Sequence, residues 1–146
     1  MAIFGVLALS IGVRLYNITT PVLWLDEAFS VYLSRMPPGQ ILLHTARDVH
    51  PPLYYLLLHY WMALFGDGLL AVRGLSVVTG VATVLVAMHL ALQIASRRAA
   101  LVAGLLMAVL PIAVRYSQEV RMYSLLALLL LVASFALMMW MQAPER

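Results

Sequence analysis

The sequence predicts an all-α, polytopic membrane protein with about four transmembrane helices, and three observations support this fold class. Of its 146 residues, 64% are hydrophobic and only 10% are charged. The mean hydropathy is +0.98, a value that excludes an ordinary soluble domain. Long apolar runs recur along the chain, and this length supplies about four spans of ~20 residues each plus one large loop.

Two further properties of the composition exclude other classes of protein. The chain contains no cysteine, which excludes a disulfide framework and a thiolate metal site. The formal net charge of +3 is small and its basic residues are scattered. We therefore predict no nucleic-acid partner.

Four apolar stretches are predicted to span the membrane. The first, from Ala2 to about Tyr16, has no basic n-region and no convincing cleavage site, so we prefer a span to a removable signal peptide. The other three are Leu69 to Ala95, Ala99 to Val114 and Met122 to Met141.

A fifth apolar stretch, Leu53 to Phe65, decides the topology. It follows Pro51-Pro52 and ends at Gly66, and as a helix it reaches only about 20 Å, short of a ~30 Å hydrocarbon core. If it crosses the bilayer, the membrane separates the pair Asp26-Glu27 from Glu119. If it lies along the outer membrane face, all of these carboxylates gather on one side.

We adopt the second, four-span interpretation. Arg97, Arg98 and Arg146 then lie on the side of the N-terminus, which the positive-inside tendency makes cytoplasmic. Residues 17–68 form one long outer loop with juxtamembrane helices, and residues 115–121 form a shorter second one. We expect a single transmembrane domain over residues 1–146, in the plasma (inner) membrane.

The stretch Pro21 to Arg35 is predicted to form an amphipathic helix at the membrane surface. Thr20 suits the cap and Pro21 suits the first helical position. On a helical wheel Asp26, Glu27, Ser30 and Ser34 fall within an arc of roughly 100°. We expect this acidic edge to face water or a cavity.

The polar residues of the predicted outer side suit one kind of reaction. A carboxyl group near an apolar site can act as a general base, and Arg and His can hold the phosphate of an amphiphilic donor. Together they indicate transfer of a group from a lipid phosphate to an acceptor hydroxyl or amine. The candidate catalytic residues are Asp26, Glu27 and Glu119, and the candidate substrate-binding residues are His50, Arg73, Arg115, Arg121 and Tyr123.

Four segments carry a resemblance to a known family. They are LWLDEAFS, HPPLYYLLLHYWMALFG, AVRGLS and RRAALVAGLLMAVLPIAVRYSQEVRMYSLL. In this order they resemble the N-terminal part of the GT-C glycosyltransferases, in particular bacterial relatives of protein O-mannosyltransferases and lipid A aminoarabinose transferases. The chain is thus expected to be the N-terminal portion of a larger enzyme, inactive by itself.

The resemblance implies a mechanism. Such enzymes use sugars linked to polyprenyl phosphate and invert the anomeric centre, and Asp26 would be the base that takes a proton from the acceptor. Aminoarabinose transferases tend to have Arg at the position of Phe29 and Lys at that of His50, so two permanent charges are missing here. Their second-loop acid tends to lie closer to Tyr123 than Glu119 does.

The same residues also suit simpler roles. Asp26 and Glu27 are able to pair with Arg35, Glu119 with Arg115 four residues away, and Arg73 is able to extend to the headgroups. Trp24, Tyr54, Tyr55 and Trp61 suit an aromatic interface belt.

Two alternatives stay open. A carboxylate set suits a divalent cation such as Mg²⁺ or Mn²⁺, but the spacing is no ligand signature, so no metal is assigned. The second alternative is that the chain is a non-catalytic membrane module that binds or translocates lipid-linked carbohydrate. In the preferred interpretation its partners are a lipid-phosphate sugar donor and a glycan, lipid or protein acceptor.

Overall fold

The computed structural model describes residues 2–48 and 50–142, and within them every regular element is an α-helix. Arg146, one of the residues used to orient the chain, lies outside the described residues. The helices are α1 (Ala2–Leu15), α2 (Leu25–Ser34), α3 (Pro38–Thr45), α4 (Leu53–Phe65), α5 (Leu69–Ile94), α6 (Arg97–Val109), α7 (Pro111–Ser117) and α8 (Tyr123–Gln142).

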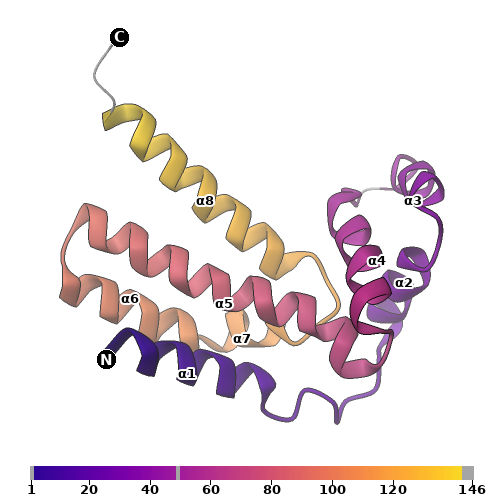
Figure 1. The fold of residues 1–146 in the computed structure, drawn as a ribbon, viewed down its shortest axis with the longest axis horizontal. Coiled ribbons are helices and arrows are strands. Elements are labelled where there is room, and N and C mark those ends of the chain that lie inside the picture. The colour runs from indigo at the N-terminus through magenta and orange to yellow at the C-terminus, as the bar shows by residue number, and fades with distance from the viewer. Residues whose placement is uncertain (1, 49, 143–146) are drawn as a thin grey trace.

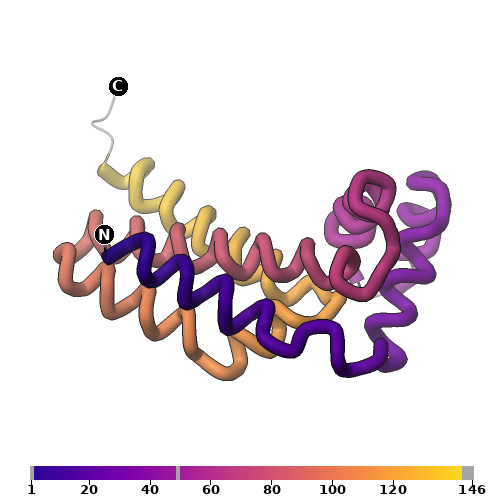
Figure 2. The backbone as a smooth tube through the Cα atoms, turned by 60° about the horizontal axis from the view of Figure 1, so that its bottom comes forward, coloured from indigo at the N-terminus to yellow at the C-terminus, as the bar shows by residue number. Residues whose placement is uncertain are grey.

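Four helices run along the long axis of the molecule, and the short ones gather at one end. Figure 1 shows α1, α5, α6 and α8 side by side in the longer part, with α2, α3 and α4 together at the other end. Figure 2 shows α1 lying along α5 and α6. The loop between α5 and α6 lies at the end away from α2–α4, and α6 begins there with Arg97 and Arg98.

The chain is a membrane protein by the length and polarity of its helices. Two described helices, α5 and α8, are long and apolar enough to cross a membrane. A third span results if α6 and α7, which are bent by 59° relative to each other, are counted together. Helix α1 is apolar but has only 14 residues.

Helix α5 is the central element because one of its faces is lined with small and hydroxyl-bearing residues. Such residues let helices approach closely inside a membrane. Thr79 Oγ1 lies 2.8 Å from Ser124 Oγ of α8. At Gly80 the approach is closer still, since an added Cβ would lie 2.2 Å from Ser117 Oγ of α7.

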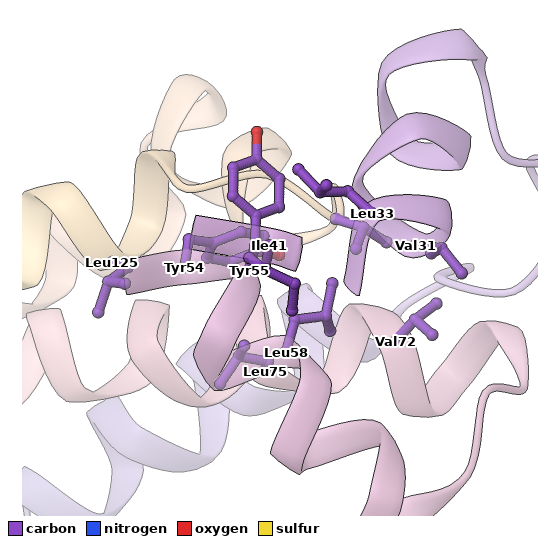
Figure 3. Close-up of a cluster of buried hydrophobic side chains, with 10 residues drawn as sticks. Val31, Leu33, Ile41, Tyr54, Tyr55, Leu58, Val72, Leu75 and Leu125 are labelled. Carbon is purple, nitrogen blue, oxygen red and sulfur yellow. The ribbon is translucent and has the colours of Figure 1, made fainter. Parts of the chain in front are cut away.

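Helix α4 has the bounds that the sequence predicts. Pro52 precedes it, and Gly66, with a φ of +83°, ends it. Tyr54 Oη lies 3.0 Å from Ser76 Oγ, and the indole of Trp61 donates to the carbonyl of Ala71, 2.8 Å away. Helix α4 is thus held against the first turns of α5, and Figure 3 shows its side chains in the buried cluster with α2, α3 and α8.

The predicted helix start at Pro21 is wrong. Helix α2 begins at Leu25 after an extended Trp24, and Thr20 bonds to the Asn17 side chain instead of capping a helix. The physical reason is a buried arginine: Arg73 donates to the carbonyls of Ile18, Pro21 and Val22 and holds this segment in an irregular loop.

The predicted span from Ala99 to Val114 is divided into two helices, because the helix breaks at Leu110. Pro111 lacks the N–H that the carbonyl of Met107 would receive in a continuous helix. Arg14 of α1 replaces it by donating to the carbonyls of Met107 and Ala108, each 3.0 Å away. A buried cation therefore stabilises the exposed carbonyl end of α6.

Candidate active site

A buried ion pair joins the segments that meet at the α2–α4 end of the molecule. Arg73 Nε donates to Glu27 Oε1 (2.9 Å) and Arg73 Nη2 donates to Glu27 Oε2 (2.7 Å), which is the two-pronged geometry of a strong pair. The side chains of Glu27 and Arg73 are 1% and 4% exposed. We call these two residues the clamp.

All donors of the clamp arginine are occupied. Besides Glu27, Arg73 donates through Nη1 to the carbonyls of Ile18 and Pro21 and through Nη2 to that of Val22. A guanidinium has five N–H groups, and these contacts use all five. The predicted substrate-binding role of Arg73 stays a prediction, and in this structure no donor is left over for a ligand.

The clamp carboxylate also binds the second predicted loop. The backbone N–H of Val120 donates to Glu27 Oε1 over 2.9 Å, and that of Trp24 lies 3.4 Å from Glu27 Oε2. This contact confirms the prediction that the acid pair and the segment around Glu119 lie on one side of the molecule. The catalytic role predicted for Glu27 is not tested by this contact.

The prediction that the polar edge of α2 faces water or a cavity is wrong for Ser30 and Ser34, which are buried, but not for Asp26, which is half exposed, or Glu27, which lines a cavity. Glu27 is buried by its pair with Arg73. Ser30 and Ser34 are buried because α2 packs against α4, where the carbonyl oxygen of Ser34 lies 2.9 Å from His59 Nδ1. The apolar residues Leu25 and Tyr32 are exposed instead. Such an inverted pattern suits a helix whose outer side meets lipid.

Asp26 lies beside a group of polar side chains that are less tightly bound. Its side chain is 47% exposed, and its Oδ2 lies 3.9 Å from Arg121 Nη2. The same nitrogen is 3.3 Å from His50 Nε2, and His50 Nδ1 is 2.9 Å from Asp48 Oδ2. Tyr123 completes the group, with the guanidinium carbon of Arg121 5.7 Å from its ring centre. We call Asp26, Asp48, His50, Arg121 and Tyr123 the open cluster.

Two buried polar atoms near this cluster have no hydrogen-bond partner among the described residues. They are Arg121 Nε and the hydroxyl oxygen of Tyr55. Buried polar atoms without partners are rare and call for an explanation such as a ligand or a catalytic role. Burial raises the pKa of the Tyr55 hydroxyl above its ordinary value, so the group stays a protonated donor.

Sequence reasoning missed Tyr55 and Asp48. Tyr55 was assigned to the aromatic belt together with Tyr54, although adjacent positions of a helix point in different directions. That difference is the signal that was available: Tyr54 pairs with α5, whereas the ring of Tyr55 lies edge-on to His50.

Glu119 occupies a different place from Asp26. Its Oε1 accepts from Arg115 Nε over 3.0 Å, the i,i+4 pair that was considered as a simpler role. Both residues line a cavity of about 360 Å³ that Asp26, His50 and Arg121 do not line. The structure thus brings His50, Arg121 and Tyr123 to Asp26, and Arg115 to Glu119.

The carboxylates do not converge as a metal site. Within residues 2–48 and 50–142, no three His, Asp or Glu side chains are placed to hold one ion. The Asp26, Glu27 and Glu119 set considered for Mg²⁺ or Mn²⁺ is divided between the open cluster, the clamp and the cavity. Arg35, considered as a partner of the acid pair, binds Asp67 instead (2.7 Å).

Comparison with known proteins gives one match. A family model described as dolichyl-phosphate-mannose-protein mannosyltransferase matches residues 49–146. This range contains His50, Arg73, Arg121 and the α5–α8 bundle, and it begins after the acid pair. No curated protein and no solved structure matches.

Proposed function

The chain belongs to the dolichyl-phosphate-mannose-protein mannosyltransferase family, whose members are glycosyltransferases of the GT-C type, and from this premise we propose its reaction. The protein moves a sugar from a polyprenyl-phosphate-linked donor to an acceptor hydroxyl or amine, with inversion at the anomeric carbon. The reaction takes place at the outer face of the plasma membrane, with the N-terminus cytoplasmic. Arg97 and Arg98, at the opposite end from the open cluster, support this orientation.

One observation carries the proposal. Asp26, a half-exposed carboxylate, lies beside the buried Arg121. The Nε of Arg121 has no partner in the described part of the chain, and its contacts to Asp26 and His50 are 3.3 Å or longer. An arginine whose N–H groups are unpaired or make only long contacts can donate to a phosphate oxygen. The clamp arginine, with all its donors occupied, has none.

The proposed step uses the carboxylate and the cation in separate roles. Asp26 accepts the proton of the acceptor hydroxyl as the acceptor oxygen forms a bond to the anomeric carbon. The bond between that carbon and the phosphate oxygen breaks, and its electron pair leaves with the phosphate. Arg121 and His50 stabilise the developing phosphate charge. Attack from the face opposite the leaving group inverts the sugar.

The surroundings of the cluster suit an amphiphilic donor. An apolar cavity of about 170 Å³ between α4 and α8 is lined by Met122 and Tyr123, next to Arg121, and by Leu126 and Leu129 further along α8. It suits the first isoprene units of a lipid tail. Glu27 and Arg73 act as positioning residues, since they hold α2 against Val120 and so set Asp26 beside Arg121.

The test is Asp26→Asn in the complete natural protein that contains these residues, assayed in membranes with radiolabelled polyprenyl phosphate mannose. We expect transfer to fall by about 10²–10⁴-fold, the range of a lost general base, while donor binding is retained. Asp67→Asn is the matched control, because Asp67 is an exposed aspartate that pairs only with Arg35 in the described structure.

Two outcomes count against the proposal. Unchanged transfer by Asp26→Asn removes Asp26 from the reaction. Donor binding by the natural protein without any transfer favours the alternative, a non-catalytic module that binds or translocates lipid-linked carbohydrate.

A further inference from the structure

A second candidate site lies next to the clamp, between the loop that precedes α2 and the segment around Glu119. The cavity of about 360 Å³ is formed by residues of the 17–24 loop and by Arg115, Gln118 and Glu119, with the clamp residues also in its wall. This volume lies within the range of small-molecule sites. We call it the Trp24 cavity, after the largest side chain that lines it.

The walls of the Trp24 cavity are fixed by the fold. Gln118 Nε2 donates to the carbonyls of Arg14 and Tyr16 at the end of α1, 3.0 and 2.9 Å away. The clamp binds the other side through Trp24 and Val120. A site whose walls are held by such contacts loses little conformational freedom when a ligand binds.

The charges of the Trp24 cavity cancel. It is lined by two arginines and two glutamates, and each arginine is bonded to one glutamate: Arg73 to Glu27 and Arg115 to Glu119. A phosphate placed here would meet both carboxylates. The lining therefore favours an uncharged ligand with many hydrogen-bonding groups over an anion.

The open side of the Trp24 cavity offers the groups that bind a sugar ring. Trp24 is 47% exposed and presents an indole, a flat apolar surface on which the C–H face of a pyranose can stack. Glu119 accepts from Arg115 through Oε1 alone among the described residues, and Arg115 uses Nε alone. Glu119 Oε2 and the Arg115 Nη groups are thus placed for hydroxyls.

We infer that the Trp24 cavity binds a neutral sugar ring of the acceptor, next to the ring that reacts at Asp26. This inference rests on the proposed function, and it names a glycan as the acceptor class. Glu27 lines the Trp24 cavity, and Asp26 is the residue before it in α2. In this proposal the glycan extends from the cavity toward Asp26, while the phosphate of the donor stays at Arg121.

The test uses tryptophan fluorescence of the purified protein in detergent, titrated with methyl α-mannoside and with mannobiose. We expect saturable quenching by the neutral sugars and no competition by inorganic phosphate. Glu119→Gln is expected to weaken binding about 10-fold, the value of one hydrogen bond to a charged group. Trp24→Phe is expected to remove the quenching and to keep the helical circular dichroism.

The control is Trp61→Phe, because Trp61 packs on α5 away from the cavity. It is expected to leave the quenching unchanged. Quenching that persists in Trp24→Phe, equal binding by Glu119→Gln, absence of saturation, or displacement by phosphate would each overturn the inference.

The failure of this inference is distinguishable from the failure of the proposed function. Asp26→Asn is expected to keep sugar binding in the Trp24 cavity while it loses transfer. If Asp26→Asn loses transfer but the natural protein binds no sugar, only the inference about the Trp24 cavity is rejected. Sugar binding together with unchanged transfer in Asp26→Asn rejects the role of Asp26 alone.

Discussion

Asp26 and Glu27 are neighbours in the chain, yet their carboxylates differ strongly in exposure and in ion pairing. The Glu27 side chain is 1% exposed, paired through both oxygens with Arg73 and bonded to the backbone of Val120. The Asp26 side chain is 47% exposed, and its ion contact is 3.9 Å long. One carboxylate holds segments together, and the other is accessible to a reactant.

The two arginines differ in the same way. Arg73 uses five donors on Glu27 and on three carbonyls, whereas the Nε of the buried Arg121 has no partner within residues 2–48 and 50–142. A group whose bonds are complete cannot accept a proton or a phosphate unless the fold loosens. A group with unused donors can bind a ligand without that cost. From this difference we propose a stabilising role for the clamp and a chemical role for the open cluster.

The largest expected effect comes from breaking the clamp. Because Glu27→Gln leaves the Arg73 cation buried without its counter-charge, we expect the free energy of unfolding to fall by about 3–5 kcal/mol. Thermal melting in detergent measures it. Asp26→Asn, the matched change one residue earlier, is expected to cost less than about 1 kcal/mol because its pair is half exposed. Equal losses in the two variants would contradict the contrast.

The next effect tests how the second loop is held near Asp26. Gly80→Ala would place a Cβ 2.2 Å from Ser117 Oγ and 2.8 Å from Ser117 Cβ, so α7 has to move. We expect a loss of about 1–3 kcal/mol in unfolding free energy, as for other overpacked sites. Gly12→Ala on α1 meets nothing within 4 Å and is expected to be neutral or slightly stabilising. A neutral Gly80→Ala would show that α7 is loosely placed.

The adjacent residues Tyr54 and Tyr55 are expected to change the unfolding free energy in opposite directions when each is replaced by Phe. Tyr54→Phe removes a hydroxyl bonded to Ser76 Oγ and is expected to lower the unfolding free energy by about 1 kcal/mol. Tyr55→Phe removes a buried hydroxyl that has no partner among the residues the structure describes, and is expected to raise the unfolding free energy by about 1 kcal/mol. Both are measured by melting in the absence of donor. A loss in both variants would mean that the Tyr55 hydroxyl already has a partner.

The smallest effect is expected for the exposed pair of Arg35 and Asp67. The side chains are 60% and 59% exposed although the atoms are 2.7 Å apart. Arg35→Ala is expected to cost at most about 1 kcal/mol, because water weakens such pairs. The loss should shrink further in 1 M salt. A loss comparable to that of Glu27→Gln would remove burial as the reason for the strength of the clamp.

Local signals explain the parts of the fold that were predicted well. Pro52 and Gly66 bound α4 through their own backbone restrictions, and α5 is recognisable as a long apolar run. The resemblance that placed Asp26 in a catalytic role depends on short motifs, and the family match from residue 49 onward supports the same family. None of these signals requires knowledge of distant contacts.

The sequence by itself determined the membrane class, most helices and the polar residues that gather at one end. Only the tertiary structure decided that Glu27 is buried and Asp26 accessible, and that α2 begins at Leu25. It also decided that Glu119 lines a cavity that Asp26 does not line. The physical reason is that the burial of a side chain depends on a partner that is distant in the sequence. A helical wheel shows which residues share a face, but Arg73, which pairs with Glu27 on that face, lies 46 positions away in the sequence.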